Sequence, residues 1–403
     1  MQMATSVKLS IVMPCLNEAA TLAACIRQAR TGALATGMED FEIIVADNGS
    51  VDGSPDIARS EGAVVVDVPD RGYGAAIRAG IEASRGEFIV MADSDMSYEL
   101  SEIRPFVDAL LEGHQLVIGT RIRGRIMNGA MPFLHRYVGN PFLTALANLF
   151  FGTRLSDYHC GMRAFRRDAI RALDLRTIGM EFASEMLIRA AQAGLRIHEV
   201  PITYHPAGRN RPPHLRTWRD GWRHLRFLLL YSPRWLLLYP GVVMTALGGA
   251  VSGILMAGPL RFGSVTFDVH SLLFSATLFV IGVQLVLLAL LARAYASRAG
   301  LMPESPRLER FLDGFSLGLG LTAGLLVLGF GIALYGVGLY VWGENSFGPI
   351  FFYQSTLRLA IAGTTLIILG GEVFFGSFVL SLLSLQYSDK QASSGNLARS
   401  RAP

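Results

Sequence analysis

The chain has 403 residues, of which 51% are hydrophobic and only 17% are charged, and its formal net charge is +4. A typical soluble domain carries about 25% charged residues, so this composition excludes a disordered or fibrous chain and argues against a purely soluble one. The three cysteines, Cys15, Cys25 and Cys160, are too few and too scattered for a disulfide framework or a zinc cluster. We expect reduced thiols in a cytoplasmic compartment.

The first half of the chain alternates between two kinds of segment. Short apolar runs predict strands at Leu9–Met13, Phe41–Ala46, Ala63–Val68, Phe88–Ala92 and Leu116–Gly119. Helical patterns lie between them, at Glu18–Arg30, Ser54–Glu61, Ala75–Ser84 and Leu100–Glu112. This alternation predicts an α/β domain with a mostly parallel, Rossmann-like sheet covered by helices on both faces. The opening residues lack the basic and long apolar regions of a signal peptide, and none is expected.

The second half contains four long apolar stretches. Leu236–Ala257, Ser271–Ala292 and Phe315–Trp342 carry no formal charge, and Leu359–Leu385 carries only Glu372. As a helix, each is long enough to cross the roughly 30 Å hydrocarbon core of a bilayer. We therefore predict an all-α transmembrane domain of four helices over residues 236–385. Its small residues offer faces for helix packing, within the subunit or between subunits of a homo-oligomer, at Gly314, Gly318, Gly320 and Gly324.

Basic residues predict the orientation. They gather between the second and third stretches and in the C-terminal tail, at Arg293, Arg298, Arg307, Arg310, Lys390, Arg399 and Arg401. The positive-inside rule then places the N-terminal domain and both termini of an integral cytoplasmic (inner) membrane protein in the cytoplasm. Residues 211–235 are rich in Arg and Trp just before the membrane, which predicts a juxtamembrane segment on anionic lipid rather than on nucleic acid. Residues 386–403 are expected to form a disordered tail.

Polar residues follow the predicted strands. They form the segments Pro14–Glu18, Asp47–Gly53, Asp93–Ser97 and Gly119–Arg123. In an open α/β sheet, ligands bind beyond the carboxyl ends of the strands. Asp93 and Asp95 come directly after an apolar strand and indicate a site for Mg²⁺ or Mn²⁺, which takes few carboxylates together with substrate phosphates. A polar turn that caps a helix is the alternative for this pair alone.

These segments together resemble a known family. Ile11–Glu18, Val45–Gly53 and the Asp93-Ser94-Asp95 motif are similar to family 2 glycosyltransferases of the GT-A fold. Gly72–Gly80 also matches that family, and it lacks the third glycine of a dinucleotide-binding fingerprint. Within the family the chain resembles dolichyl- or polyprenyl-phosphate hexose synthases, through residues 121–136, 157–163 and 202–206. The likeness covers residues 8 to about 230 and implies a GT-A domain over residues 1–210.

The resemblance implies a donor, a metal and an acceptor. The donor is a nucleotide diphosphate sugar, UDP-glucose or GDP-mannose, bound by Pro14, Asn17, Glu18, Asp47, Asp93, Ser94 and Asp95. Asp95, Asp93 and Ser97 hold Mg²⁺ or Mn²⁺, although Ser97 stands where the mannosyl members often have Gln. The acceptor phosphate is bound by Arg121, Arg136 and Asn140, and Arg209 closes over the phosphates of donor and acceptor. Asp95, Arg121, Arg136 and Arg209 are thus the predicted catalytic residues.

The chemistry of a lipid phosphate fits these residues. A phosphomonoester is largely a dianion at pH 7, so it attacks a sugar without a general base and needs positive charge, for which guanidinium is suited. We therefore predict an inverting hexosyltransferase that acts on polyprenyl (dolichyl or undecaprenyl) phosphate at the cytoplasmic membrane face. A helix over about 131–151 is expected to lie in the headgroup plane, with an ordinary core helix as the alternative.

Two other functions stay open at this point. The first is a family 2 membrane glycosyltransferase with a hydroxyl acceptor in cell-envelope polysaccharide or glycolipid synthesis. It needs a carboxylate base and usually a Gln-x-x-Arg-Trp motif, in which Tyr231 replaces the Gln here. Glu181 and Glu185 are four residues apart on a predicted helix, and we expect them to contact the donor sugar or to orient a loop, with a structural role as the alternative. The second is a non-enzymatic membrane protein with a vestigial nucleotide domain, which the intact acids disfavour.

Overall fold

The structure is a computed structural model, and it describes residues 7–208, 217–299, 302, 306–344, 346–348 and 353–399. The chain divides into two compact units, Met1–Leu230 and Tyr231–Pro403. The predicted Arg209 lies outside the described residues, so its predicted role stays a prediction.

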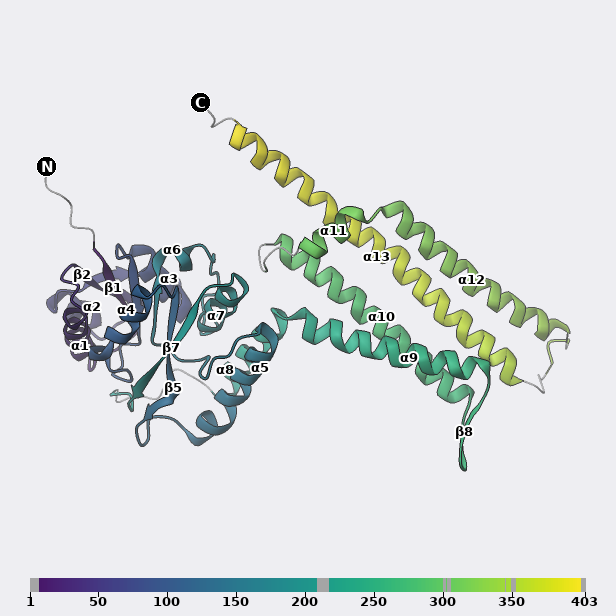
Figure 1. Ribbon diagram of the computed structural model, residues 1–403, viewed down its shortest axis with the longest axis horizontal. Helices are drawn as coiled ribbons and strands as arrows, with labels where there is room; N and C mark the ends of the chain where they lie inside the picture. The colour runs from purple at the N-terminus through teal and green to yellow at the C-terminus, as the bar shows by residue number, and fades with distance from the viewer. Residues whose placement is uncertain are drawn as a thin grey trace. The chain divides into compact units, whose positions relative to one another are not determined.

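The first unit is built on a seven-stranded sheet (Figure 1), in the order β3-β2-β1-β4-β6-β5-β7. Its strands are β1 (Leu9–Cys15), β2 (Phe41–Asp47), β3 (Val64–Asp67), β4 (Phe88–Met91), β5 (Leu116–Ile126), β6 (Arg163–Arg166) and β7 (Ile197–Tyr204). Neighbouring strands are parallel except β6, which is antiparallel to both β4 and β5. The predicted α/β class with a mostly parallel sheet is confirmed. The carboxyl ends of β1, β2, β4 and β5 therefore share one edge.

Helices follow the strands as predicted, with shifted ends. They are α1 (Leu22–Ala35), α2 (Ser54–Ser60), α3 (Tyr73–Ala83), α4 (Arg104–Leu111), α5 (Asn140–Phe151), α6 (Arg167–Arg171), α7 (Phe182–Gln192) and α8 (Thr217–Leu230). The first helix begins at Leu22 and not at Glu18, because the intervening residues form a turn. Thr21 Oγ1 at the end of that turn donates to the Ser94 carbonyl at 2.7 Å, which ties the turn to the loop after β4.

Strand β5 is longer than the sequence predicted. It continues past Gly119 because β7 pairs with it as far as Ile126 opposite Tyr204, across an irregularity between Thr120 and Arg125. Arg121 and Arg125, which the sequence placed in a loop after the strand, therefore lie on the strand itself. The apolar run ends at Gly119, so no strand was expected beyond it, and its partner strand β7 lies far along the chain.

The second unit contains the four predicted membrane helices. Its elements are α9 (Tyr239–Ala257), a hairpin of β8 (Leu260–Phe262) and β9 (Val265–Phe267), α10 (Val269–Arg298), α11 (Pro306–Gly314), α12 (Leu317–Glu344) and α13 (Tyr353–Arg399). Four segments are long and apolar enough to span a membrane: Arg234–Ala257, Val269–Arg298, Leu317–Glu344 and Gln354–Leu383. Helix α13 continues to Arg399. The disordered tail expected over residues 386–403 stays a prediction.

Glycines set how closely these helices pack. The main contacts join α9 with α10, α12 with α13, and α10 with α13, as Figure 1 shows. A Cβ on Gly248 would lie 2.5 Å from the Phe279 nitrogen on α10, and one on Gly324 would lie 2.7 Å from the Phe374 nitrogen on α13. Both helix pairs therefore meet backbone to backbone, as is typical of membrane helices.

The cysteines allow a simple prediction. All three are buried and free of disulfides, and burial raises the pKa of Cys25 and of Cys160 to about 12. Because the thiolate is the nucleophile, iodoacetamide at pH 8 should leave the native protein unmodified and should alkylate three thiols after denaturation. Intact-mass spectrometry measures both states. Rapid alkylation of the native protein would contradict the burial of these side chains.

Candidate functional site

The loops after β1, β2 and β4 form one surface at the carboxyl edge of the sheet. Cys15 pairs with Asp47 at the ends of β1 and β2. Ser94 Oγ donates to the Pro14 carbonyl at 2.8 Å, which joins the loop after β4 to the end of β1. The structure thereby brings together the segments that carry the predicted donor-binding residues: Pro14, Asn17, Glu18, Asp47, Asp93, Ser94 and Asp95.

Two of these loops are held against each other by hydrogen bonds. Asn17 has a left-handed backbone (φ +57°), its N–H donates to Ser50 Oγ, and its Oδ1 accepts from the Val51 N–H, both at 2.8 Å. Asp47 Oδ2 accepts from the N–H groups of Gly49 and Ser50, each at 3.0 Å. Asp47 Oδ1 is buried and has no hydrogen-bond partner in the part of the chain that the structure describes. A buried oxygen of this kind can accept a hydrogen bond from a ligand.

The Asp93-Ser94-Asp95 loop presents its carboxylates differently. Asp93 hydrogen-bonds with Tyr73, a tyrosine whose pKa is raised by burial and then by the charge of Asp93. Asp95 is buried, and its Oδ1 accepts from the Ser97 N–H at 3.0 Å. No three His, Cys, Asp or Glu side chains gather as metal ligands among the described residues. The two carboxylates of this loop are of the kind that a hard cation takes together with phosphate oxygens and water.

The glycines of residues 72–80 serve packing. A Cβ on Gly72 would lie 2.1 Å from the Ile178 carbonyl oxygen, and one on Gly74 would lie 2.6 Å from that of Thr177. The Ala75 N–H in the first turn of α3 donates to the same Ile178 oxygen at 3.2 Å. The start of α3 is therefore filled by protein, which agrees with the prediction that this stretch is no dinucleotide site.

Arg121, a predicted acceptor ligand, is held by a carboxylate. Its Nε lies 2.7 Å from Asp157 Oδ2 and its Nη2 lies 2.8 Å from Asp157 Oδ1, and both residues are buried. Burial disfavours the charged form of both residues, but their mutual attraction and hydrogen bonds outweigh it. The pKa of Asp157 is therefore lowered and that of Arg121 is raised. The guanidinium also stacks on Tyr204, with its carbon 5.2 Å from the ring centroid. Arg121 is thus permanently charged and fixed in place.

Tyr204 links this arginine to the acidic loop. The rings of Tyr204 and Tyr98 are 5.4 Å apart, and the Tyr98 backbone follows Ser97 directly. The Tyr98 hydroxyl accepts from the Gly161 N–H at 2.8 Å, on the turn that also carries Asp157. Acids after β4 and the cation on β5 therefore belong to one connected edge of the sheet.

The other predicted acceptor residues lie at the start of α5. Arg136 is half-buried on a π-helical turn, His135–Gly139, with its guanidinium carbon 5.3 Å from the Tyr137 ring centroid. Asn140 is the first residue of α5, and its Nδ2 lies 3.6 Å from Met131 Sδ. The pKa of His135 on the same turn is lowered by burial and then by the charge of Arg121.

This part of the first unit also exposes an apolar surface, here called the apolar face. It consists of Phe133, Leu134, Tyr137, Val138, Phe142 and Leu149. The opposite side of α5 is buried through Leu143, Thr144 and Ala147. Helix α8 contacts α5 and exposes Trp218 and Trp222 in the same unit. Large side chains at helical spacing on the outside are the reverse of an ordinary core helix.

Two glutamates hold loops: Glu185, for which loop orientation was one of the expected roles, and Glu199, which the sequence did not single out. Glu185 is fully buried and accepts from the Thr177 N–H at 2.9 Å and from Thr177 Oγ1 at 2.7 Å. Glu199 accepts from the Ser156 N–H at 2.7 Å and pairs with Arg123 at 3.3 Å. Glu185 is therefore occupied as a loop anchor, and nothing in its sequence context distinguished this from a catalytic carboxylate.

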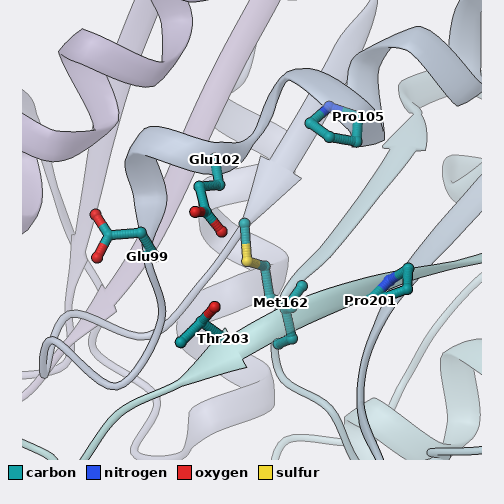
Figure 2. Close-up of a pocket in the computed structure, with 7 residues that line it drawn as sticks. Glu99, Glu102, Pro105, Met162, Pro201 and Thr203 are labelled. Carbon is teal, nitrogen blue, oxygen red and sulfur yellow. The ribbon is translucent and has the colours of Figure 1, made fainter. Parts of the chain in front are cut away.

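A separate pocket of about 200 Å³ lies beside β7 (Figure 2). It is lined by Glu99, Glu102, Pro105, Met162, Pro201, Ile202 and Thr203. In Figure 2 the Glu102 carboxylate points toward Met162, while Glu99 is directed away from it. None of the predicted donor or acceptor residues lines this pocket, so we place the candidate site at the carboxyl edge of the sheet and not here.

Comparisons with known proteins identify the family of the chain. Residues 10–174 match the model of "Glycosyl transferase family 2", and residues 290–384 match "Glycosyltransferase family 2 C-terminal transmembrane region". The chain is 36% identical to the low-salt glycan biosynthesis hexosyltransferase Agl6 of Haloferax volcanii, over 93% of this chain and 89% of that protein. It is 36% identical to a dolichyl-phosphate hexose transferase of the same organism, over 40% of this chain and 69% of that protein.

The solved structures that the chain resembles include glucosyl-3-phosphoglycerate synthase of Mycobacterium tuberculosis in complex with UDP. The two sequences are 28% identical, and the match covers 55% of this chain and 79% of the solved chain, with a TM-score of 0.44. The family models and the Haloferax hexosyltransferase, which the chain matches almost end to end, identify the chain. It belongs to glycosyl transferase family 2, and it is an integral membrane glycosyltransferase.

Proposed function

We propose that this enzyme transfers a hexose from a nucleotide diphosphate sugar to a polyprenyl phosphate, with inversion, at the cytoplasmic face of the membrane. One observation carries the proposal: a buried, ion-paired arginine lies at the same sheet edge as the Asp93-Ser94-Asp95 loop. A fixed cation of this kind suits a phosphate acceptor, because guanidinium binds phosphate in a defined geometry. A hydroxyl acceptor would instead need a free carboxylate base. Glu185 is already engaged by Thr177, whereas Glu181 keeps one buried oxygen without a hydrogen-bond partner among the described residues.

In this proposal, one group of residues binds the donor and another binds the acceptor. Asp47 Oδ1 accepts from the N–H of the nucleobase, and the turn around Asn17 holds the nucleoside. Asp95, with Asp93 and Ser97 nearby, would hold Mg²⁺ or Mn²⁺, which offsets negative charge on the leaving diphosphate when bound. Arg121 orients the acceptor phosphate, and Arg136 and Asn140 complete its cradle from the start of α5. The phosphate oxygen is already ionised, so no residue needs to remove a proton.

The apolar face supports a lipid acceptor. It exposes six large apolar side chains next to Arg136, so a membrane surface can cover the apolar part while the arginine contacts a phosphate at the headgroup level. The name of the dolichyl-phosphate hexose transferase of Haloferax volcanii points the same way. The basic segments between α10 and α12 and at the C-terminus favour a cytoplasmic position for the first unit.

A donor panel tests the proposal. Purified full-length protein is incubated with UDP-glucose, GDP-mannose and other nucleotide sugars, with Mg²⁺ or Mn²⁺ and geranylgeranyl phosphate, and the lipid product is weighed by mass spectrometry. We expect a product one hexose heavier than the lipid phosphate, with a β linkage by NMR. Transfer to a sugar hydroxyl acceptor in a parallel reaction, with none to the lipid phosphate, would overturn the proposal in favour of polysaccharide or glycolipid synthesis.

A further inference from the structure

Two imidazoles join helix α8 to the rest of the first unit. His224 on α8 is buried, and its Nδ1 lies 3.0 Å from Ser184 Oγ on α7. Its ring meets the ring of His159 edge to face, with the centroids 4.9 Å apart and the planes at 83°. Phe227 and Leu228 on the same helix are buried as well. One side of α8 is therefore fixed to the domain, while Trp218 and Trp222 on the helix stay exposed.

His159 continues the path toward the acceptor arginine. It lies two residues after Asp157, and its backbone N–H donates to Asp157 Oδ1 at 3.2 Å. The same oxygen accepts from Arg121 Nη2. The carboxylate accepts four hydrogen bonds, three from Arg121 and one from His159. A movement of the His159 peptide therefore shifts the one bond that does not come from Arg121, and with it the carboxylate and the guanidinium.

The His159 side chain acts here through its shape. Both ring nitrogens are buried and have no hydrogen-bond partner among the residues that the structure describes. What the ring does provide is a packed contact between the turn at residues 156–163 and α8. A phenyl ring of similar size can make that contact, and a methyl group cannot.

We propose that His159 and His224 are positioning residues that couple α8, the helix directly before the membrane unit, to Arg121. The exposed tryptophans make α8 the element of the first unit that responds to the bilayer surface, since Trp prefers the interface between water and lipid. The imidazole pair then transmits the placement of α8 to the Asp157–Arg121 ion pair. This inference rests on the proposed role of Arg121 in binding the acceptor phosphate.

Binding measurements without transfer test the coupling. Full-length protein in nanodiscs of anionic phospholipid is titrated with geranylgeranyl phosphate and, separately, with whichever of UDP and GDP binds the wild type. We expect His159→Ala and His224→Ala to raise the Kd for the lipid phosphate about tenfold while the nucleotide Kd changes less than twofold. His159→Phe should bind both ligands like the wild type. A general loss of structure would raise the Kd for both ligands, whereas a loss of positioning raises only the Kd for the lipid phosphate.

Two further variants complete the design. His198→Ala removes one ring of another stacked pair, His114 and His198, whose centroids are 4.7 Å apart. This pair lies at the amino-terminal ends of β5 and β7, away from the candidate site, so the variant should change neither Kd. Arg121→Ala tests the underlying function: if it binds lipid phosphate like the wild type, the acceptor role of Arg121 is wrong. If Arg121→Ala weakens binding and neither histidine-to-alanine variant does, the coupling is overturned and the proposed function stands.

The pH dependence of stability gives a second readout. Burial, followed by the charge of His224, lowers the pKa of His159 to about 3. The groups that face it are His224 on α8, Asp157 on its own turn, Arg121 on β5 and Arg163 on β6. As the pH falls below about 6.5, the unfolded chain takes up a proton that the folded chain cannot, so the native state loses stability toward acid. Between pH 7 and 5, Tm should fall less in His159→Phe than in the wild type. Equal slopes would overturn the buried, packed placement of this ring.

Discussion

Asp95→Asn should lower the rate of sugar transfer about a thousandfold, equivalent to ~4 kcal/mol of barrier. Asparagine has the shape of aspartate and can still accept the Ser97 N–H through its oxygen, so the loop should keep its structure. It lacks the negative charge that holds a divalent cation, and neutralisation of the leaving diphosphate is worth several kcal/mol. The initial rate of transfer to geranylgeranyl phosphate, measured with the accepted donor and Mn²⁺, checks this.

Asp108→Asn is the matched control. Asp108 is half-exposed on α4 after the same loop, and its carboxylate lies 3.6 Å from Arg104. An exposed pair of this kind contributes little, so this variant should keep the wild-type rate. Treatment of the wild type with EDTA should reproduce the loss seen in Asp95→Asn, and added Mn²⁺ should restore the rate. A rate for Asp95→Asn within tenfold of the wild type would exclude Asp95 from metal binding.

Arg136→Ala should reduce transfer about a hundredfold or more while the nucleotide still binds. The loss of a charge-assisted contact to a phosphate costs about 3 kcal/mol. The effect should fall on the lipid acceptor, because Arg136 lies at the start of α5, whereas the donor residues lie after β1, β2 and β4. Steady-state kinetics with varied geranylgeranyl phosphate, together with nucleotide titration, separates the two substrates.

Arg154→Ala is the control for this variant. Arg154 follows the other end of α5, is exposed, and has the same charge. If Arg136 acts only by attracting anionic lipid, both variants should lose activity to a similar degree. Added salt should then lower the activity of the wild type in the same way, because it screens this attraction. If Arg136 binds the acceptor phosphate, only Arg136→Ala loses activity. Full turnover in Arg136→Ala would remove that residue from the site.

Much of the first unit could be predicted from patterns of a few residues. The first five strands appear where apolar runs were found, because a strand buried on both faces is a continuous apolar segment. The third, β3, is an exception in burial: it lies at the edge of the sheet and is partly exposed. The donor-binding loops followed from the same reasoning, since parallel strands end at one edge. The four membrane helices followed from length and the absence of charge, and all four are present.

Other elements depend on distant parts of the chain. Strand β6 is four residues long and contains the fully buried Arg163, so neither its length nor its polarity indicates a strand. The ion pair of Arg121 and Asp157 spans 36 residues. Each residue alone is typical of a polar loop, and only the pairing of β5 with its neighbours brings them together. The contact between His159 and His224 depends on α8, which follows the sheet in sequence.

The close approach of α9 to α10 and of α12 to α13 bears on how the protein is made. Each pair is a hairpin of consecutive helices, and each forms its glycine contacts without help from the other. The first hairpin can thus assemble in the lipid while the ribosome is still synthesising the second. The second hairpin and the contact of α10 with α13 form once the last helix has been made. A larger side chain at Gly248 or Gly324 should therefore impair biogenesis before it affects the chemistry of the finished enzyme.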